Sequence, residues 1–355
     1  MTAHSDPAPT TARNTGSPRE RELLKAARDG DRDAFGRLVE PFRRGLHAHC
    51  YRMLGSHGDA EDALQETLLR AWRALPRFEE RSSLRSWLYR IATNACLRAI
   101  ERLPKRLLPI DYAPAADPHD GLAEAVNEPV WLEPYPDADL GLEGLAGPAA
   151  RYEQREAIEL AFIAALQHLP ARQRAVLILR DVLGFSARET AHVLETTPVS
   201  VDSALQRAHK TVDERLPSQT QQQTLRLIGD DELSQLVERY LAAWERNDVD
   251  AVVTMLAEDA RLVMPPLPTW VSGRDQVAAF LRTYTFSGAK RWRMVPTSAN
   301  GQPAFATYSW DEQTAAFMPH SLSVLTLREG KVEEITAFMT PDPFPHFNLP
   351  ASIAG

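Results

Sequence analysis

Apolar residues recur at helical spacing in two segments of the chain, residues 19–106 and 151–216, and follow no regular period between them. The intervening residues 107–150 include seven prolines and four glycines, a composition typical of a linker. The pattern therefore predicts two all-α domains joined by a linker. A chain of 355 residues also has room for a third domain, because single cores stop growing well below that length.

The third domain is predicted over residues 230–350, after a Gln-rich connector at residues 217–229. Its first helix has one buried face, made of Leu233, Leu236, Val237, Tyr240, Leu241 and Trp244. Further helices are expected at residues 251–256 and 274–284. Strand-like runs follow at residues 291–297, 304–310, 321–328 and 332–338, and Glu329-Gly330 predicts a tight turn between the last two. Helices followed by a meander of strands predict an α+β domain.

Residues 186–212 carry the signals of two short helices joined by a turn. Ser186 and Glu189 form a capping box, and Thr197 caps a second helix that has Pro198 at its first position. The inward face of the second helix is Val201, Leu205, Ala208 and Val212, which leaves Ser200, Ser203, Gln206, Arg207 and Lys210 outward. This pattern predicts a helix-turn-helix, whose second helix can enter a DNA major groove. A generic helical hairpin is the alternative.

Two adjoining patterns mark the first helical segment. Asp59, Asp62 and Glu66, with Gln65 beside them, form an acidic stripe, which indicates either a solvated face or a docking surface for a basic partner. Residues 77–106 then mix aromatic rings with eight Lys/Arg and three Glu, a net charge of +5. Single-stranded DNA needs this mixture, because phosphates pair with cations while unstacked bases lie on ring faces. Taken alone, Trp87 and Leu88 are more simply core residues.

Composition and charge indicate which classes of protein and site the chain does not fit. The net charge of −8 argues against uniform coating of nucleic acid, and residues 107–150 hold nine Asp/Glu and no Lys or Arg. Two cysteines exclude a disulfide framework and indicate a reducing, cytoplasmic location. No apolar run approaches the roughly 18–20 residues of a membrane span. Residues 1–18 have the Ser/Thr/Pro-rich composition of a disordered tail. His47, His49 and Cys50 lack a second ligand cluster, so we expect no metal or cofactor.

The order of these motifs resembles the sigma factor family, in its extracytoplasmic-function branch, over residues 19–216. Residues 34–35 and 51–55 look like the opening of sigma region two, and residues 59–67 look like the helix that binds the clamp coiled coil of RNA polymerase. Residues 86–94 are similar to the segment that opens and reads the minus-ten promoter element. The helix-turn-helix matches sigma region four, which reads the minus-thirty-five element and touches the polymerase flap.

The resemblance implies a transcription initiation factor that is not an enzyme, with three sets of contact residues. The polymerase-binding set is Asp59, Asp62, Gln65 and Glu66. The minus-ten set is Arg77, Arg81, Ser83, Arg85, Trp87, Tyr89, Arg90, Asn94 and Arg98. The minus-thirty-five set is Thr197, Ser200, Ser203, Gln206, Arg207 and Lys210. Asp202, Ala204 and His209 stand where basic residues are common in the family, so we expect a weak minus-thirty-five grip. A regulator that uses only the helix-turn-helix is the alternative.

The motif at residues 131–137 and the α+β tail resemble the sigma subgroup with a fused SnoaL-like domain. The expected architecture is multidomain: a region-two helical bundle, a region-four helix-turn-helix and an α+β cone shared with nuclear transport factor two. Asp248, Asp259, Trp270 and Trp310 could line the pocket of the cone, with Asp259 at a strand start, but they include no clear acid–base pair. We expect this domain to modulate sigma activity. A domain that binds a small molecule or acts as an enzyme is the alternative.

The acidic linker cannot bind DNA, yet it connects two DNA-reading domains. Repulsion from DNA and attraction to the basic block at residues 77–106 favour folding it back onto the protein. Trp131, Leu132 and Tyr135 supply an apolar anchor. We therefore predict that residues 131–137 dock at the junction of the C-terminal domain with both helical domains. A disordered spacer is the alternative.

Overall fold

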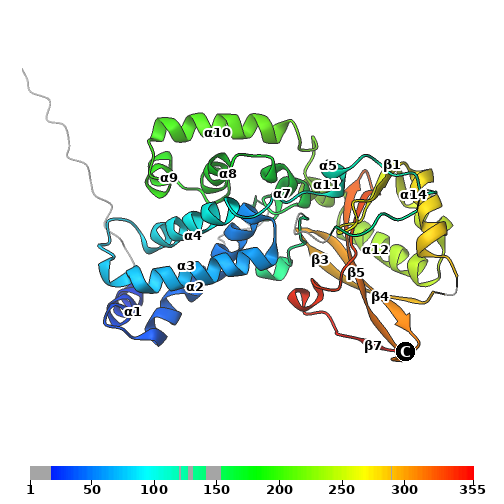
Figure 1. Ribbon diagram of the computed structural model, residues 1–355, viewed down its shortest axis with the longest axis horizontal. Helices are drawn as coiled ribbons and strands as arrows, with labels where there is room; N and C mark the ends of the chain where they lie inside the picture. The colour runs from blue at the N-terminus through cyan, green and yellow to red at the C-terminus, as the bar shows by residue number, and fades with distance from the viewer. Residues whose placement is uncertain (1–16, 120, 127–130, 141–152, 289) are drawn as a thin grey trace, which may run out of the picture.

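The computed structural model describes residues 17–119, 121–126, 131–140, 153–288 and 290–355. Two helical domains lie side by side, and the C-terminal domain packs against one end of them (Figure 1). The tail predicted over residues 1–18 falls outside the described residues except for its last two.

The first helical domain is a bundle built around the long helix α2. Side chains fix where the helices begin: Ser17, Asp31, Ser56 and Ser83 each accept a hydrogen bond from a first-turn backbone N–H. Gly55 ends α2 with a φ of 72°, in the left-handed region that glycine favours. The elements are α1 (Pro18–Arg28), α2 (Arg32–Leu54), α3 (His57–Ala74), the 3-10 turn η1 (Leu75–Arg77) and α4 (Leu84–Ile100).

The second helical domain contains the predicted helix-turn-helix. Ser186 and Glu189 form the capping box at the start of α9, and Thr197 accepts a hydrogen bond from the Ser200 N–H at the start of α10, with Pro198 as its first residue. Both predicted helix starts are confirmed. The elements are α7 (Leu160–Gln167), α8 (Ala171–Leu177), the π-helical turn η3 (Ile178–Val182), α9 (Ala187–Val193) and α10 (Pro198–Asp213).

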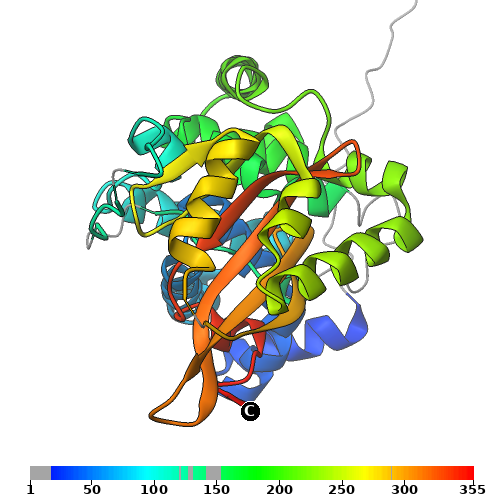
Figure 2. The same ribbon diagram turned by 90° about the vertical axis from the view of Figure 1, so that its right-hand side faces the viewer.

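The C-terminal domain is an α+β cone, in which α12 and α14 cover the face of a mixed sheet that points away from the helical domains (Figure 2). The strand order is β2-β1-β6-β5-β4-β3, and β7 pairs with β5. The helices are α11 (Gln221–Ile228), α12 (Asp230–Glu245), α13 (Val249–Thr254), α14 (Arg274–Phe280) and the π-helical turn η4 (Leu281–Thr285). The strands are β1 (Leu256–Val263), β2 (Trp270–Ser272), β3 (Trp292–Ala299), β4 (Gln302–Asp311), β5 (Ala316–Arg328), β6 (Lys331–Phe338) and β7 (Ile353–Ala354), and the 3-10 turn η5 (Phe344–Phe347) precedes β7.

This domain agrees with the sequence in its meander and differs before it. The four strands β3 to β6 occupy the predicted runs, and Glu329 and Gly330 adopt φ values of 52° and 73°, as a tight hairpin turn requires. The helix expected at residues 251–256 ends at Thr254, because Leu256 starts β1. Strand β1 runs parallel to the distant β6, so the prediction of helices followed only by a meander was wrong here.

The linker is ordered where the structure describes it. It contains α5 (Pro109–Tyr112) and the 3-10 turn η2 (Asp137–Asp139), and it makes isolated bridges from Trp131 to Leu107 and from Pro136 to Ala299 of β3. The Trp270 indole N–H of β2 donates to the Ala113 carbonyl, 2.8 Å away. One continuous apolar core joins the helical domains, the linker and the face of the sheet that points towards the helical domains. The described parts of the linker therefore pack on the helical domains and on the C-terminal domain.

Candidate polymerase and promoter interface

The acidic stripe on α3 is only partly open to a partner. Asp62 and Gln65 are exposed, and Glu66 forms an ion pair with Arg70 one turn later. Asp59 instead lies 2.5 Å from Nη2 of Arg106, a buried residue at the start of the linker. This pair, between residues far apart in sequence, occupies Asp59 within the protein in this arrangement. The more open part of the stripe is made of Asp62, Gln65 and Glu66.

The minus-ten set begins with exposed residues before and at the start of α4. Arg77 and Arg81 are exposed, and Arg81 forms an ion pair with Glu79. Ser83 is also exposed, but its hydroxyl accepts the Ser86 N–H at 3.1 Å and so caps α4. The two arginines are therefore accessible to phosphates in this arrangement.

The middle of α4 is covered by the second helical domain. Nη2 of Arg85 donates to the Leu183 carbonyl at 2.9 Å, and its guanidinium lies 4.6 Å from the ring centroid of Phe185. The Tyr89 ring, 5% exposed, meets Phe185 edge-on at 5.7 Å between centroids. These contacts place the face of Tyr89 in a protein interface, so the expectation that it offers an open ring to DNA does not hold for this arrangement.

The rest of the minus-ten set is paired or half-buried. Nη2 of Arg90 lies 2.9 Å from the Glu195 carboxylate, in the turn of the helix-turn-helix. The Trp87 ring packs on Phe78 with centroids 4.8 Å apart, which agrees with the core reading of this residue. Asn94 and Arg98 are half-buried, and burial lowers the pKa of Arg98. The structure thus brings most of this set to one helix and covers its centre.

The predicted minus-thirty-five set lies on one outward face of α10. Thr197, Ser200, Gln206, Arg207 and Lys210 are exposed and Ser203 is half-buried. The helix runs along the outer edge of the second helical domain in Figure 1. The same face carries Val199, which is 74% exposed and which the sequence reasoning did not single out. Unlike the middle of α4, this face of α10 is exposed to solvent.

The linker anchor is buried between the domains. Trp131, Leu132 and Tyr135 are 6%, 1% and 0% exposed. The Glu133 N–H donates to the Gly55 carbonyl at 3.0 Å. A Cβ at Gly55 would lie 2.6 Å from Leu132 Cδ2, so glycine is needed there both for its φ of 72° and for the close approach of Leu132. The end of α2 is therefore shaped to receive the linker.

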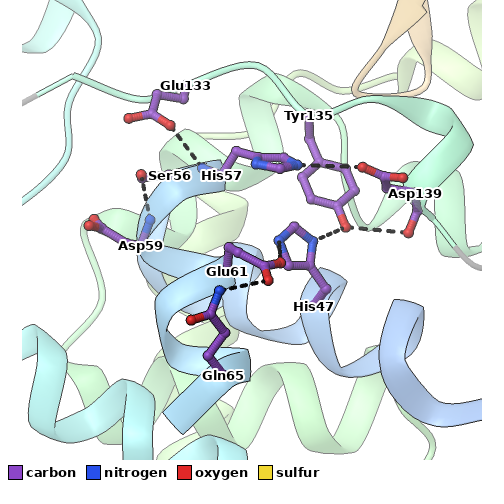
Figure 3. A network of polar contacts seen from close by, with 9 residues as sticks. All are labelled: His47, Ser56, His57, Asp59, Glu61, Gln65, Glu133, Tyr135 and Asp139. Atoms are coloured by element: carbon purple, nitrogen blue, oxygen red, sulfur yellow. Dashed lines mark hydrogen bonds and ion pairs between the residues drawn. The ribbon is translucent and has the colours of Figure 1, made fainter. Parts of the chain in front are cut away.

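Tyr135 lies beside His47 and His57 in a network of polar contacts (Figure 3). Its hydroxyl is 2.8 Å from Nδ1 of His47 and its ring is 4.4 Å from that of Tyr51. His57 lies 3.4 Å from the Asp139 carboxylate and stacks on His346 of the C-terminal domain, with ring centroids 4.0 Å apart. Burial lowers the pKa of His47 to about 4, so this ring is neutral at pH 7.

Asn300, at the tight turn between β3 and β4, forms hydrogen bonds with the linker and with both helical domains. Its side-chain oxygen accepts the Tyr135 N–H at 2.9 Å, and its amide nitrogen donates to the Tyr51 hydroxyl at 3.0 Å and to the Ile158 carbonyl at 2.8 Å. These partners belong to the linker, α2 and the start of the second helical domain. The φ of 55° suits Asn, which tolerates the left-handed region. No local sequence signal indicates that this residue forms hydrogen bonds with several domains.

A second tie connects the second helical domain to the cone. The buried Glu159 carboxylate accepts the backbone N–H groups of Gln221 and Gln222 at 3.0 and 2.8 Å, at the first turn of α11. Burial raises the pKa of Glu159 to about 7. The Gln222 side chain also donates to the Gly301 carbonyl at 2.6 Å. The Gln-rich connector is therefore a docked helix, which the Thr220–Gln223 capping box could have indicated.

The four residues expected around a pocket of the cone have separate surroundings. Asp248 caps α13, Trp270 binds the linker, and the Trp310 ring packs on Phe317 at 5.2 Å. Asp259 lies inside β1 and not at a strand start, is exposed, and pairs with Arg328 of the adjoining hairpin. These four side chains therefore do not converge on one site.

No helix among the described residues is both long and apolar enough to cross a membrane. Within the same residues, no group of three or more His, Cys, Asp or Glu side chains could hold a metal ion.

Comparison with known families matches each of the three domains. Residues 38–106 match Sigma-70 region 2, residues 159–212 match Sigma-70 region 4, and residues 237–335 match the SnoaL-like domain. Among curated proteins, the chain is 42% identical over 330 residues to the ECF RNA polymerase sigma factor SigG of Mycobacterium tuberculosis, which covers 92% of this chain and 86% of the relative. It is 32% identical to SigM of the same species over 53% of this chain and 79% of the relative.

Among solved structures, the fold is similar to that of the extracytoplasmic function sigma factor SigJ of Mycobacterium tuberculosis. The TM-score is 0.52, the sequence identity is 23%, and the match covers 88% of this chain and 98% of the other. At this identity the likeness concerns the fold alone, and it extends through the helical domains and the C-terminal domain.

Proposed function

Because the chain belongs to the extracytoplasmic-function family of RNA polymerase sigma factors, we propose that its free form is a closed sigma subunit, in which the linker and the SnoaL-like domain hold region four over the minus-ten helix α4. The chain is an alternative sigma factor with a fused C-terminal domain. In the active form, the α3 surface binds the clamp of core polymerase, α4 takes the melted minus-ten strand, and α10 enters the minus-thirty-five groove.

The observation that carries this proposal is the cover over α4. Arg85, Tyr89 and Arg90 contact Leu183, Phe185 and Glu195 of region four, respectively. An unstacked base needs a free ring face, and a phosphate needs an unpaired cation. Region four must therefore leave α4 before these residues act on DNA, whereas α10 is open from the start.

In this proposal the fused domain holds regions two and four in their closed arrangement. Asn300 and the η5 residue His346 contact the linker and region two, while α11 receives Glu159 of region four. Aromatic rings fill the space between helix and sheet, since Tyr240 packs on Phe305 at 4.9 Å and near Trp244 at 5.9 Å. This packing favours the structural role over a ligand-sensing or enzymatic one, which stays the alternative.

Open-complex formation with core polymerase tests the closed form. Glu195→Lys places a cation against Arg90 and should speed promoter opening about two- to fivefold, since an exposed ion pair contributes roughly 0.2–1 kcal/mol. Glu214→Lys makes the same charge change at an exposed site at the end of α10, away from α4. Equal opening rates for the two variants, measured by run-off transcription and permanganate footprinting, would contradict the proposal.

A further inference from the structure

A cavity of about 370 Å³ lies between region two and region four. Its walls include Lys105 and Arg106 after α4, and His168 and Arg174 around the turn from α7 to α8. Three of these side chains, Lys105, Arg106 and Arg174, are cations in a chain of net charge −8, and Asp59 also lines the cavity. Cations gathered around a cavity attract anions and raise their local concentration.

Pairing within the protein neutralises only part of this charge. Arg106 has Asp59 at 2.5 Å, and Asp111 lies 3.2 Å from His168 and 3.6 Å from Arg215. The Lys105 ammonium donates only to Nδ1 of His168, at 2.9 Å. Two of the wall cations, Lys105 and Arg174, thus have no carboxylate partner in the described part of the chain.

The lack of a carboxylate partner matters most for Arg174, because this side chain is only 5% exposed. Its guanidinium donates to the Gln167 side-chain oxygen at 2.6 Å and to the Met53 and Leu169 carbonyls, while its Nε has no partner among the described residues. Burial lowers the pKa of both Arg174 and Lys105, and the nearby Asp111 carboxylate offsets only part of the effect on Lys105. A buried cation is costly unless an opposite charge lies near it.

We propose that this cavity binds a phosphate group, which bridges Lys105 of region two and Arg174 of region four. The volume accommodates a small phosphate compound, and arginine and lysine are the usual phosphate partners in proteins. The phosphate comes either from a free anion or from the DNA backbone. Because the cavity lies between region two and region four, this proposal rests on the closed form proposed above. Its test follows pyrophosphate binding to the free protein, whereas Glu195→Lys tests promoter opening, so the two failures can be told apart.

The first arm titrates the full-length protein with sodium pyrophosphate at constant ionic strength, which NaCl maintains, and follows the melting temperature. At about tenfold excess over Kd, bound anion should raise Tm by about 2–4 °C. Lys105→Ala should weaken the apparent affinity about tenfold or more, because it removes a hydrogen bond between charged groups, and Lys105→Arg should restore much of it. Lys25→Ala, an exposed lysine in α1, is the matched control.

The second arm measures binding of a promoter duplex across salt concentrations without pyrophosphate. Loss of the pyrophosphate shift in Lys105→Ala alone identifies a free anion as the ligand. A pyrophosphate-insensitive protein whose salt slope falls by about one in Lys105→Ala identifies a DNA phosphate. The proposal is overturned if Lys105→Ala changes neither quantity, or if Lys25→Ala changes them equally.

Discussion

Replacing Tyr135 with alanine should release the linker from the junction of the three domains. The side chain has no exposed surface, packs against the Tyr51 ring and contacts His47 through its hydroxyl, while its backbone pairs with Asn300. Tyr135 thus contacts region two and the C-terminal domain at one point. The junction should therefore depend on this ring more than on the rest of the described linker.

The complete burial of this ring determines how strongly its loss should weaken docking of the linker. Truncation of a buried aromatic ring to alanine costs about 3–5 kcal/mol, which lowers the docking equilibrium by roughly 10² to 10³·⁵-fold. Tyr135→Phe keeps the ring and loses the hydroxyl, which leaves Nδ1 of His47 unpaired at a cost of about 1–3 kcal/mol. The expected order of linker release is therefore alanine, then phenylalanine, then the unmodified protein.

Hydrogen exchange of the free full-length protein measures this release. The amides of Glu133, Tyr135 and Asn300 each donate a hydrogen bond across the junction, so their exchange should accelerate about 10²-fold or more in Tyr135→Ala. Leu122→Ala alters a linker side chain that is 48% exposed and should leave these amides protected. Unchanged protection of residues 131–137 in Tyr135→Ala would refute the argument that this ring anchors the linker.

Three further outcomes are expected. Asp62→Lys with Glu66→Lys should weaken binding to core polymerase in a titration, while the free energy of unfolding stays within about ±0.5 kcal/mol of its original value. The same charge changes at the exposed Glu22 and Glu238 should leave polymerase binding unchanged. Arg207→Ala should relax promoter sequence choice, and Lys210→Ala should lower the salt slope of duplex binding by about one; equal sequence preference before and after Arg207→Ala would exclude base reading. The pKa of His47 is lowered by burial from 6.5 to about 4, so the unfolded state takes up a proton first and the free energy of unfolding should fall as pH drops from 6.5 towards 4. Urea unfolding across that range should show a shallower loss for His47→Asn, and an identical slope would exclude this source of acid sensitivity.

Sequence reasoning located features that depend on neighbouring residues. The capping box at Ser186 and the Thr197-Pro198 start of α10 are local signals, so the helix-turn-helix could be placed almost to the residue. The hairpin at Glu329-Gly330 is equally local. The outward face of α10 follows from helical periodicity alone, and for this reason the minus-thirty-five set lies where it was predicted to lie on the helix.

Features that depend on residues distant in the sequence could not be predicted in this way. Strand β1 does not alternate cleanly between buried and exposed positions, and its pairing with β6 spans most of the domain. The pairing of Asp59 with Arg106, the cover of Phe185 over Tyr89 and the role of Asn300 all join residues that periodicity cannot relate. The linker motif predicted docking at the junction of the three domains, but not the side chains that receive it there, such as Tyr51 and Asn300.

The two kinds of interdomain contact differ in a way that suggests how the closed form opens. The contact of region four with α4 includes an ion pair whose side chains are 37% and 69% exposed, and such pairs contribute little to stability. The ties around Asn300, Tyr135 and Glu159 are buried and fully hydrogen-bonded, so they should persist to higher free energies of opening. The helix-turn-helix should therefore swing away from α4 while the start of region four stays held at the junction. Because α10 is exposed in the closed form, contact with the minus-thirty-five element can precede this movement, and the binding energy gained there and at core polymerase can shift the equilibrium towards the open form.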